Sequence, residues 1–163
     1  MSLDELAQLP HQSGSITLYF LPDVLVIGLS AQSTAAARMV VDSGRCHVHP
    51  PDLADEALGV AVIDAMLAAG HLVRDVTFAQ ASQARPHHLA EAAGLGSDLD
   101  AFGKRARAVM AGRSPRGDIV VSATRNEHTE DLALTALPKP LRLQAPSAVE
   151  LGQAVHTQLA ASC

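Results

Sequence analysis

Residues 55–70, DEALGVAVIDAMLAAG, decide the fold that this sequence predicts. Within them Leu58, Val62 and Met66 recur at a spacing of four, which places their side chains on one face of an α-helix. Two acidic residues begin the segment, where the helix dipole favours negative charge, and a glycine ends it. We therefore expect a helix over this range, with an apolar face covered by the rest of the chain.

A similar phrase returns near the end of the chain. Leu58-Gly59-Val60-Ala61-Val62 recurs as Leu151-Gly152-Gln153-Ala154-Val155, behind a capping box formed by Ser147 and Glu150. Glycine inside a helix costs about 1 kcal/mol relative to alanine. A repeated glycine therefore predicts close packing at the helix backbone. We expect each helix to pack closely across a sheet. The alternative is a chance echo, since amphipathic helices share Leu, Ala and Val.

Strand patterns precede each of the two helices. The predicted strands are 15–20, 24–29, 38–42 and 45–49 in the first half, and 118–124, 132–137 and 141–144 in the second. A turn at Pro22-Asp23 closes the first hairpin, and Ser43-Gly44 predicts a turn between the next two strands. The segment 30–37, rich in Ser, Thr and Ala, is either a loop or a weak helix.

The middle of the chain favours helices. A short helix is predicted at 87–93, and a longer one at 97–111 with Ser97 as its N-cap. Acids early and bases late in the longer segment complement the helix dipole. Residues 72–85 fit either a strand or a helix, and the last helix is expected to run to Cys163.

These patterns predict one α+β domain, in which a mostly antiparallel sheet is flanked by helices. Its first half spans about 15–70, its helical middle 72–112 and its second half 117–163. The two halves look like copies of one strand-plus-helix arrangement.

Charge excludes some functions. The chain has a net charge of -5; residues 1–103 hold twelve acids against four bases, whereas 104–116 hold five bases and no acid. A direct nucleic-acid binder would carry an excess of basic charge on a broad face. The acidic balance suits a basic protein partner instead.

The cysteines and the hydropathy indicate a cytoplasmic protein. Cys46 and Cys163 have no paired spacing, and neither a signal peptide nor an apolar run of about 20 residues is found. We expect reduced thiols, no membrane segment and no cofactor.

Histidines are the candidates for chemistry. His47 and His49 share one face of a predicted strand, with Cys46 on the other, and no spacing completes a metal site. A small metal-dependent hydrolase that uses these two histidines with His71 or His128 remains an alternative. The sequence has no Gly-x-Ser-x-Gly elbow and no phosphate loop, so we expect no enzyme and no bound metal.

Acidic residues are the candidates for binding a partner. They form three groups, which lie before and within the first long helix, at the start of the middle helix and in a polar loop. The groups are Asp52, Asp55 and Glu56; Asp98 and Asp100; and Glu127, Glu130 and Asp131. Each group has a simpler explanation as a helix cap or as a solvated surface.

The two helical phrases resemble a known family. Residues 54–66, ADEALGVAVIDAM, resemble a phrase of the immunity proteins of bacterial contact-dependent growth inhibition (CDI) systems, and residues 146–163 resemble the phrase that closes those proteins, down to the terminal cysteine. Met110 and the strand at 117–121 are similar to the middle of the family. Most aromatic positions of that family are aliphatic or absent in this chain.

The resemblance implies a cytoplasmic protein that binds the C-terminal toxin domain of a large surface protein delivered by a neighbouring cell. Such toxins are often nucleases that cleave tRNA. The acidic groups of this chain would attract the basic surface of such a nuclease. The matching phrases are core and capping elements, so the resemblance assigns no binding residue. A chaperone-like or structural adaptor remains a third alternative.

Overall fold

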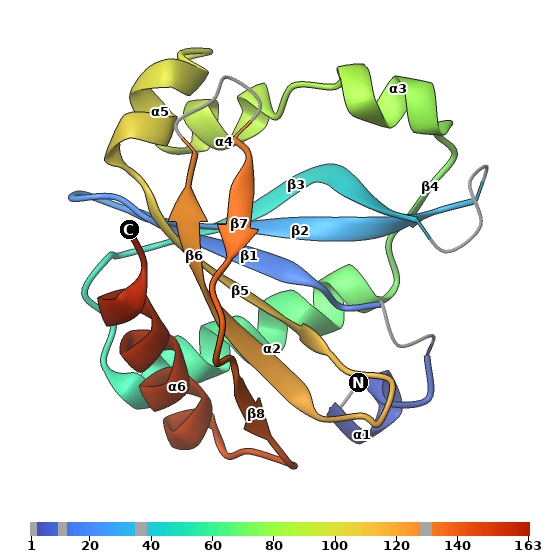
Figure 1. The fold of residues 1–163 in the computed structure, drawn as a ribbon, viewed down its shortest axis with the longest axis vertical. Helices are drawn as coiled ribbons and strands as arrows, with labels where there is room; N and C mark the ends of the chain where they lie inside the picture. Colours follow the sequence, from blue (N-terminus) through green and yellow to red (C-terminus); the bar gives the residue numbers. More distant parts are fainter. Residues whose placement is uncertain (1–2, 10–12, 35–38, 128–131) are drawn as a thin grey trace.

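The computed structural model describes residues 3–9, 13–34, 39–127 and 132–163 (Figure 1). Its strands are β1 (Ile16–Phe20), β2 (Leu25–Ser33), β3 (Val40–His49), β4 (Val73–Arg74), β5 (Arg107–Arg113), β6 (Ile119–Asn126), β7 (Leu134–Ala136) and β8 (Leu141–Leu143). They form one sheet in the order β3-β2-β1-β5-β6-β7, in which neighbours are antiparallel. β8 also pairs with β6, and β4 pairs with β2 in parallel.

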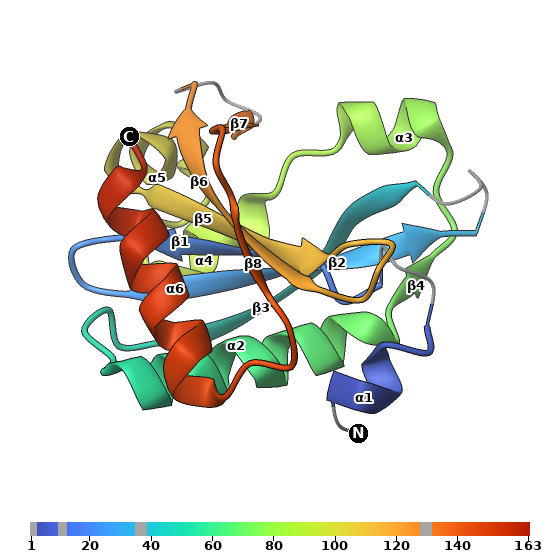
Figure 2. The ribbon, with the colours of Figure 1, turned by 60° about the horizontal axis from the view of Figure 1, so that its bottom comes forward.

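Helices cover both faces of this sheet. They are α1 (Leu3–Leu6), α2 (Asp55–Gly70), α3 (Phe78–Gln83), α4 (His87–Ala92), α5 (Leu99–Arg105) and α6 (Ala148–Ala161). Figure 2 shows α2 and α6 on one side of the sheet, with α3 and α5 on the other. The predicted α+β class is therefore confirmed. None of the helices in the described ranges is long and apolar enough to cross a membrane.

The chain repeats one arrangement around the centre of the sheet. β1, β2 and β3 form an antiparallel meander followed by α2, and β5, β6 and β8 form another followed by α6. The halves meet where β1 pairs with β5, with Leu18 opposite Val109.

Each face of the sheet has its own apolar core. On one face, Leu58 and Met66 of α2 and Leu151 of α6 pack with Leu18 and Val109. The opposite face carries a smaller core beneath α4 and α5. It contains Tyr19, Val26, Leu89, Leu99 and Phe102, and its two aromatic rings meet edge to face with centroids 5.2 Å apart.

Gly59 and Gly152 are the points at which α2 and α6 touch. A Cβ atom on Gly59 would lie 2.8 Å from the Cα atom of Ala148 and would overlap its carbonyl group; a Cβ atom on Gly152 would do the same to Asp55, also at 2.8 Å. The close packing predicted from the repeated glycine is confirmed. The expected partner was wrong, because each glycine packs against the other helix and not across the sheet.

The helix predicted at 97–111 is wrong in its second half. Asp98, not Ser97, is the cap and accepts a hydrogen bond from the Ala101 N–H at 3.0 Å; α5 then ends at Arg105. Residues 107–113 form β5, where Ala108 and Val109 are buried between β1 and β6. Pairing with two neighbours overrides the local helical preference of this alanine-rich segment.

Two loop predictions are also wrong. β2 continues through residues 30–33, which were expected to be a loop or a weak helix. β3 runs unbroken through Ser43-Gly44, because the register shifts between Leu29 and Ser30 and the strand absorbs the extra residues there. Gly44 has a φ of +77°, which a glycine tolerates.

The last helix stops before the chain does. α6 ends at Ala161, and Cys163 then extends along β6: its N–H donates to the Thr124 carbonyl at 3.0 Å and its carbonyl accepts from the Asn126 N–H at 2.7 Å. The Ser147–Glu150 capping box at the start of α6 is confirmed.

Candidate functional site

The first acidic group lies beside the junction of α2 and α6. Asp52 and Glu56 are exposed, and Asp55 is half-buried as the first residue of α2. Its Oδ1 atom lies 2.6 Å from Nδ1 of His156 on α6. Asp52 and Glu56 therefore face solvent, whereas Asp55 also joins the two helices.

The layer formed by α2 and α6 is acidic beyond this group. Neither helix contains a lysine or an arginine, and each adds an exposed acid, Asp64 on α2 and Glu150 on α6. Exposed Val60 and Val149 lie on the same helices. The sequence-based prediction did not include Asp64 or Glu150. Their common feature, a long helix without a basic residue, is visible in the sequence.

The second group caps α5. Asp98 accepts the hydrogen bond that starts the helix, and Asp100 pairs with Lys104 one turn later at 2.7 Å. The hydrogen bond and the charge of Asp100 raise the pKa of Lys104. The local explanation as a cap and an i,i+4 ion pair thus accounts for both acids.

The third group is described only in part. The Glu127 carboxylate accepts hydrogen bonds from Arg125 at 3.0 Å and from the Thr135 hydroxyl at 2.7 Å. Glu130 and Asp131 lie outside the described residues. Asn126, the neighbour of Glu127, donates to the Gly103 carbonyl of α5 at 2.6 Å, so the second and third groups share one end of the molecule, away from the start of α2 (Figure 1).

The described histidines of the alternative metal site, His47, His49 and His71, belong to no group that could hold a metal ion. The rings of His47 and His49 are neighbours, with centroids 6.4 Å apart. His71 ends α2, and His128 lies outside the described residues. Among the residues that the structure places, no three His, Cys, Asp or Glu side chains form a group that could hold a metal ion.

The surroundings of His49 favour its neutral form. Burial lowers its pKa from 6.5, the charge of His47 lowers it further, and Asp64 opposes the shift. Its Nε2 atom is buried and has no hydrogen-bond partner among the described residues. The folded protein therefore binds a proton at His49 less readily than the unfolded chain does.

We expect the free energy of unfolding to fall as the pH drops below about 6.5, because the unfolded chain then binds a proton at His49 that the folded protein resists. Urea unfolding at about pH 7.5 and about pH 5.5 measures this loss. The His49→Gln variant keeps a polar side chain that does not titrate, so its loss should be smaller. An equal loss in the variant and in the parent would assign the effect to other groups.

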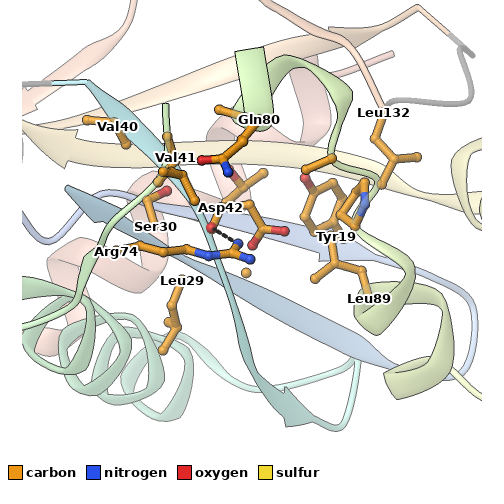
Figure 3. A pocket seen from close by; sticks show the side chains of 16 residues that line it. Tyr19, Leu29, Ser30, Val40, Val41, Asp42, Arg74, Gln80, Leu89 and Leu132 are labelled. Carbon is orange, nitrogen blue, oxygen red and sulfur yellow. Dashed lines mark hydrogen bonds between the residues drawn. The ribbon is translucent and has the colours of Figure 1, made fainter. Parts of the chain in front are cut away.

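A pocket of about 490 Å³ lies on the other side of the sheet, between β1, β2, β3 and the segment that holds α3 and α4 (Figure 3). Its polar lining includes Tyr19, Asp42, Arg74 and Gln80. Nη1 of Arg74 donates to the backbone carbonyl of Asp42 at 2.9 Å. The sequence did not predict this site, because its residues come from strands and helices far apart in the chain.

The surroundings of Tyr19 and Cys46, in and beside the pocket, do not activate either side chain as a nucleophile. Burial, and then the charge of Asp42, raises the pKa of the Tyr19 hydroxyl, and the same two causes raise that of the nearby Cys46 thiol. Both groups therefore stay protonated near neutral pH and are weak nucleophiles. Nε2 of His88 lies 3.4 Å from Oδ1 of Asp42, an ion-pair distance without hydrogen-bond geometry. The pocket contains charged side chains, Asp42 and Arg74, that a bound molecule could contact.

No protein-family model matches this chain, and no curated protein matches it. Solved structures share its fold. A protein of unknown function from Neisseria meningitidis superposes with a TM-score of 0.64 at 17% identity, covering 94% of this chain and 97% of that one. A chain of the CdiA-CT/CdiI toxin and immunity complex from Yersinia pseudotuberculosis superposes with a TM-score of 0.66 at 16% identity, covering 91% and 97%.

Proposed function

We propose that this chain is an immunity protein, which binds the toxin domain of a CDI system and blocks it. The observation that carries the proposal is the shared fold with a chain of a toxin and immunity complex over almost the whole length of both proteins. Such a complex contains two kinds of chain. The phrases at 58–62 and 151–155 and the net acidic charge support the immunity side.

The proposed activity is binding, in the cytoplasm, without a chemical reaction. We further propose that the toxin is a nuclease, with a basic surface that attracts the phosphates of its substrate. An acidic inhibitor would compete with the nucleic acid for that surface and would associate rapidly. The partner would then be the toxin domain alone, with neither a nucleic acid nor a cofactor bound to the immunity protein.

For the contact surface we propose the acidic groups, and foremost the acidic layer of α2 and α6. Asp52 and Glu56 are exposed there, and Asp64 and Glu150 extend the same charge. The groups at α5 and at the end of β6 have local partners, Lys104 and Arg125, which partly neutralise them. We therefore rank Asp98, Asp100 and Glu127 second, with Glu130 and Asp131 retained from the sequence.

The test is co-expression with the C-terminal domain of the large secreted protein that we expect to be encoded upstream. That domain should arrest growth, and this chain should restore growth and form a stable complex with it. Failure to bind or to protect would refute the proposed function. Degradation of tRNA or DNA in the arrested cells would identify the nuclease, and intact nucleic acid would refute that part of the proposal.

The triple variant Asp52→Lys, Glu56→Lys and Asp64→Lys should slow association with the toxin domain by about tenfold or more at low salt, because it reverses the attractive field of the helical layer. Stopped-flow binding at two salt concentrations measures the effect. The matched control Asp4→Lys, Asp23→Lys and Glu91→Lys changes the net charge equally on other elements and should bind at nearly the parent rate. Equal slowing in both variants would show that only net charge matters.

A further inference from the structure

Two exposed valines lie beside the contact between α2 and α6. Gly59 of α2 packs against the backbone of Ala148 on α6. Val60 follows Gly59 in α2 and is 47% exposed. Val149 follows Ala148 in α6 and is 40% exposed. Since each valine adjoins the contact and faces solvent, the two side chains lie on the outer surface of the same junction.

Helix α2 extends this apolar surface on one side of the junction. Ala57 and Ile63 lie three residues before and three residues after Val60, so both are its neighbours on the helix. Ala57 is exposed and Ile63 is half-buried. Single exposed apolar residues are ordinary on a protein surface, whereas contiguous groups with a polar rim are found at interaction sites. We name Ala57, Val60, Ile63 and Val149 the apolar patch.

Acidic side chains flank the apolar patch. Glu56 and Asp64 lie four residues before and four residues after Val60, about one helical turn away on either side. Glu150 follows Val149 on α6, and all three acids are exposed. An apolar centre with a polar rim is the usual anatomy of a protein–protein interface. The negative rim fits a partner whose surface is basic around an apolar side chain.

Backbone contacts hold the two helices, and with them the apolar patch, in one arrangement. Gly59 meets Ala148, and Gly152 meets Asp55 in the same way. Oδ1 of Asp55 also lies 2.6 Å from Nδ1 of His156. Both helices contribute to one core, and Figure 2 shows them on the same side of the sheet. A surface that is already formed loses little conformational freedom when it binds.

We propose that the apolar patch is the centre of the toxin-binding surface, where the toxin domain packs an apolar side chain that lysines or arginines flank. This inference rests on the proposed immunity function. It gives the two kinds of residue different roles. The acids attract the basic toxin and raise the association rate, whereas the patch excludes water from the bound complex and slows its dissociation.

Replacement of both valines by threonine tests the patch. Val60→Thr with Val149→Thr keeps the shape and the charge of the surface but places hydroxyl groups in its apolar centre. The dissociation rate constant of the complex with the toxin domain should rise about tenfold or more, with the association rate constant nearly unchanged. The matched control, Val48→Thr with Val73→Thr, changes valines of β3 and β4 that are 52% and 68% exposed, and it should dissociate like the parent. Surface plasmon resonance measures both rate constants.

Dissociation of the Val60→Thr, Val149→Thr variant at the parent rate, or equal acceleration in the control, would overturn this inference and leave the immunity function standing. A parent chain that neither binds nor protects would refute the immunity function, and this inference with it. Val60→Ala with Val149→Ala provides the same test if the threonine variant is unstable, because it removes the apolar contact and alanine favours the helix more than valine does. Circular dichroism and urea unfolding of each variant confirm that the fold has formed.

Discussion

Gly152→Ala should destabilise the fold by about 3 kcal/mol, because the added methyl group meets a backbone that has no room to yield. Its Cβ atom would lie 2.8 Å from the Cα atom of Asp55 and would overlap the carbonyl group next to it. A flexible side chain could rotate away from the added methyl group. The atoms that it meets belong to the backbone of α2, so the whole helix must shift. Because the contact is reciprocal, Gly59→Ala should cost a similar amount through Ala148. Urea unfolding measures both losses.

The double variant adds a sharper expectation. Once one methyl group has separated α2 from α6, the second meets a wider gap, so Gly59→Ala with Gly152→Ala should cost less than the sum of the two single changes. Gly112→Ala is the matched control. Its Cβ atom would lie 3.4 Å from the Ser15 hydroxyl oxygen, on a strand, and we expect a change within about 0.5 kcal/mol. A control as costly as Gly152→Ala would argue against the helix contact.

Phe102→Ala should cost about 3–5 kcal/mol, because it removes the largest of the fully buried side chains that the structure describes. Phe102 packs edge to face on Tyr19 and belongs to the core that joins α5 to the sheet. The cavity left behind would face Tyr19 and Leu99, and α5 would lose its main contact. Chemical unfolding should measure the lower free energy of unfolding. A probe on α5 should report that this helix separates from the sheet.

Phe102→Leu is the conservative control for this change. Leucine keeps most of the apolar volume but loses the aromatic contact with Tyr19, so the cost should be clearly smaller than for alanine. Equal costs for leucine and alanine would show that ring geometry, not buried volume, dominates at this site. A cost below about 1 kcal/mol for alanine would mean that the second core is not needed for stability.

The long helices were predictable because their signals are local. The apolar spacing of α2, the capping box of α6 and the hairpin of β1 and β2 each depend on residues that are neighbours in the sequence. The segment that became β5 carries no such local signal. Ser97 as a possible N-cap, with acids early and bases late, favoured a helix at 97–111. Only the pairing of Val109 between β1 and β6 decides otherwise.

The candidate functional residues also divide into those that the sequence predicts and those that only the structure brings together. The exposed acids at the start of α2 were predictable, since acids in a first helical turn and beside it face solvent. Their neighbours Asp64 and Glu150 share the acidic layer only because α2 and α6 pack side by side. The pocket was not predictable, because Tyr19, Asp42 and Arg74 belong to three different strands and the segment above them crosses the sheet.

The repeated Leu-Gly-x-Ala-Val phrase shows where sequence ends and tertiary structure begins. The sequence by itself determined that two helices with apolar faces would form and that a glycine in each would allow a close approach. Only the tertiary structure decided what is approached: each glycine admits the backbone of the other helix. The physical reason is that periodicity specifies which face of a helix is buried, whereas its partner depends on how the two meanders join at β1 and β5 and bring α2 and α6 to the same face of the sheet.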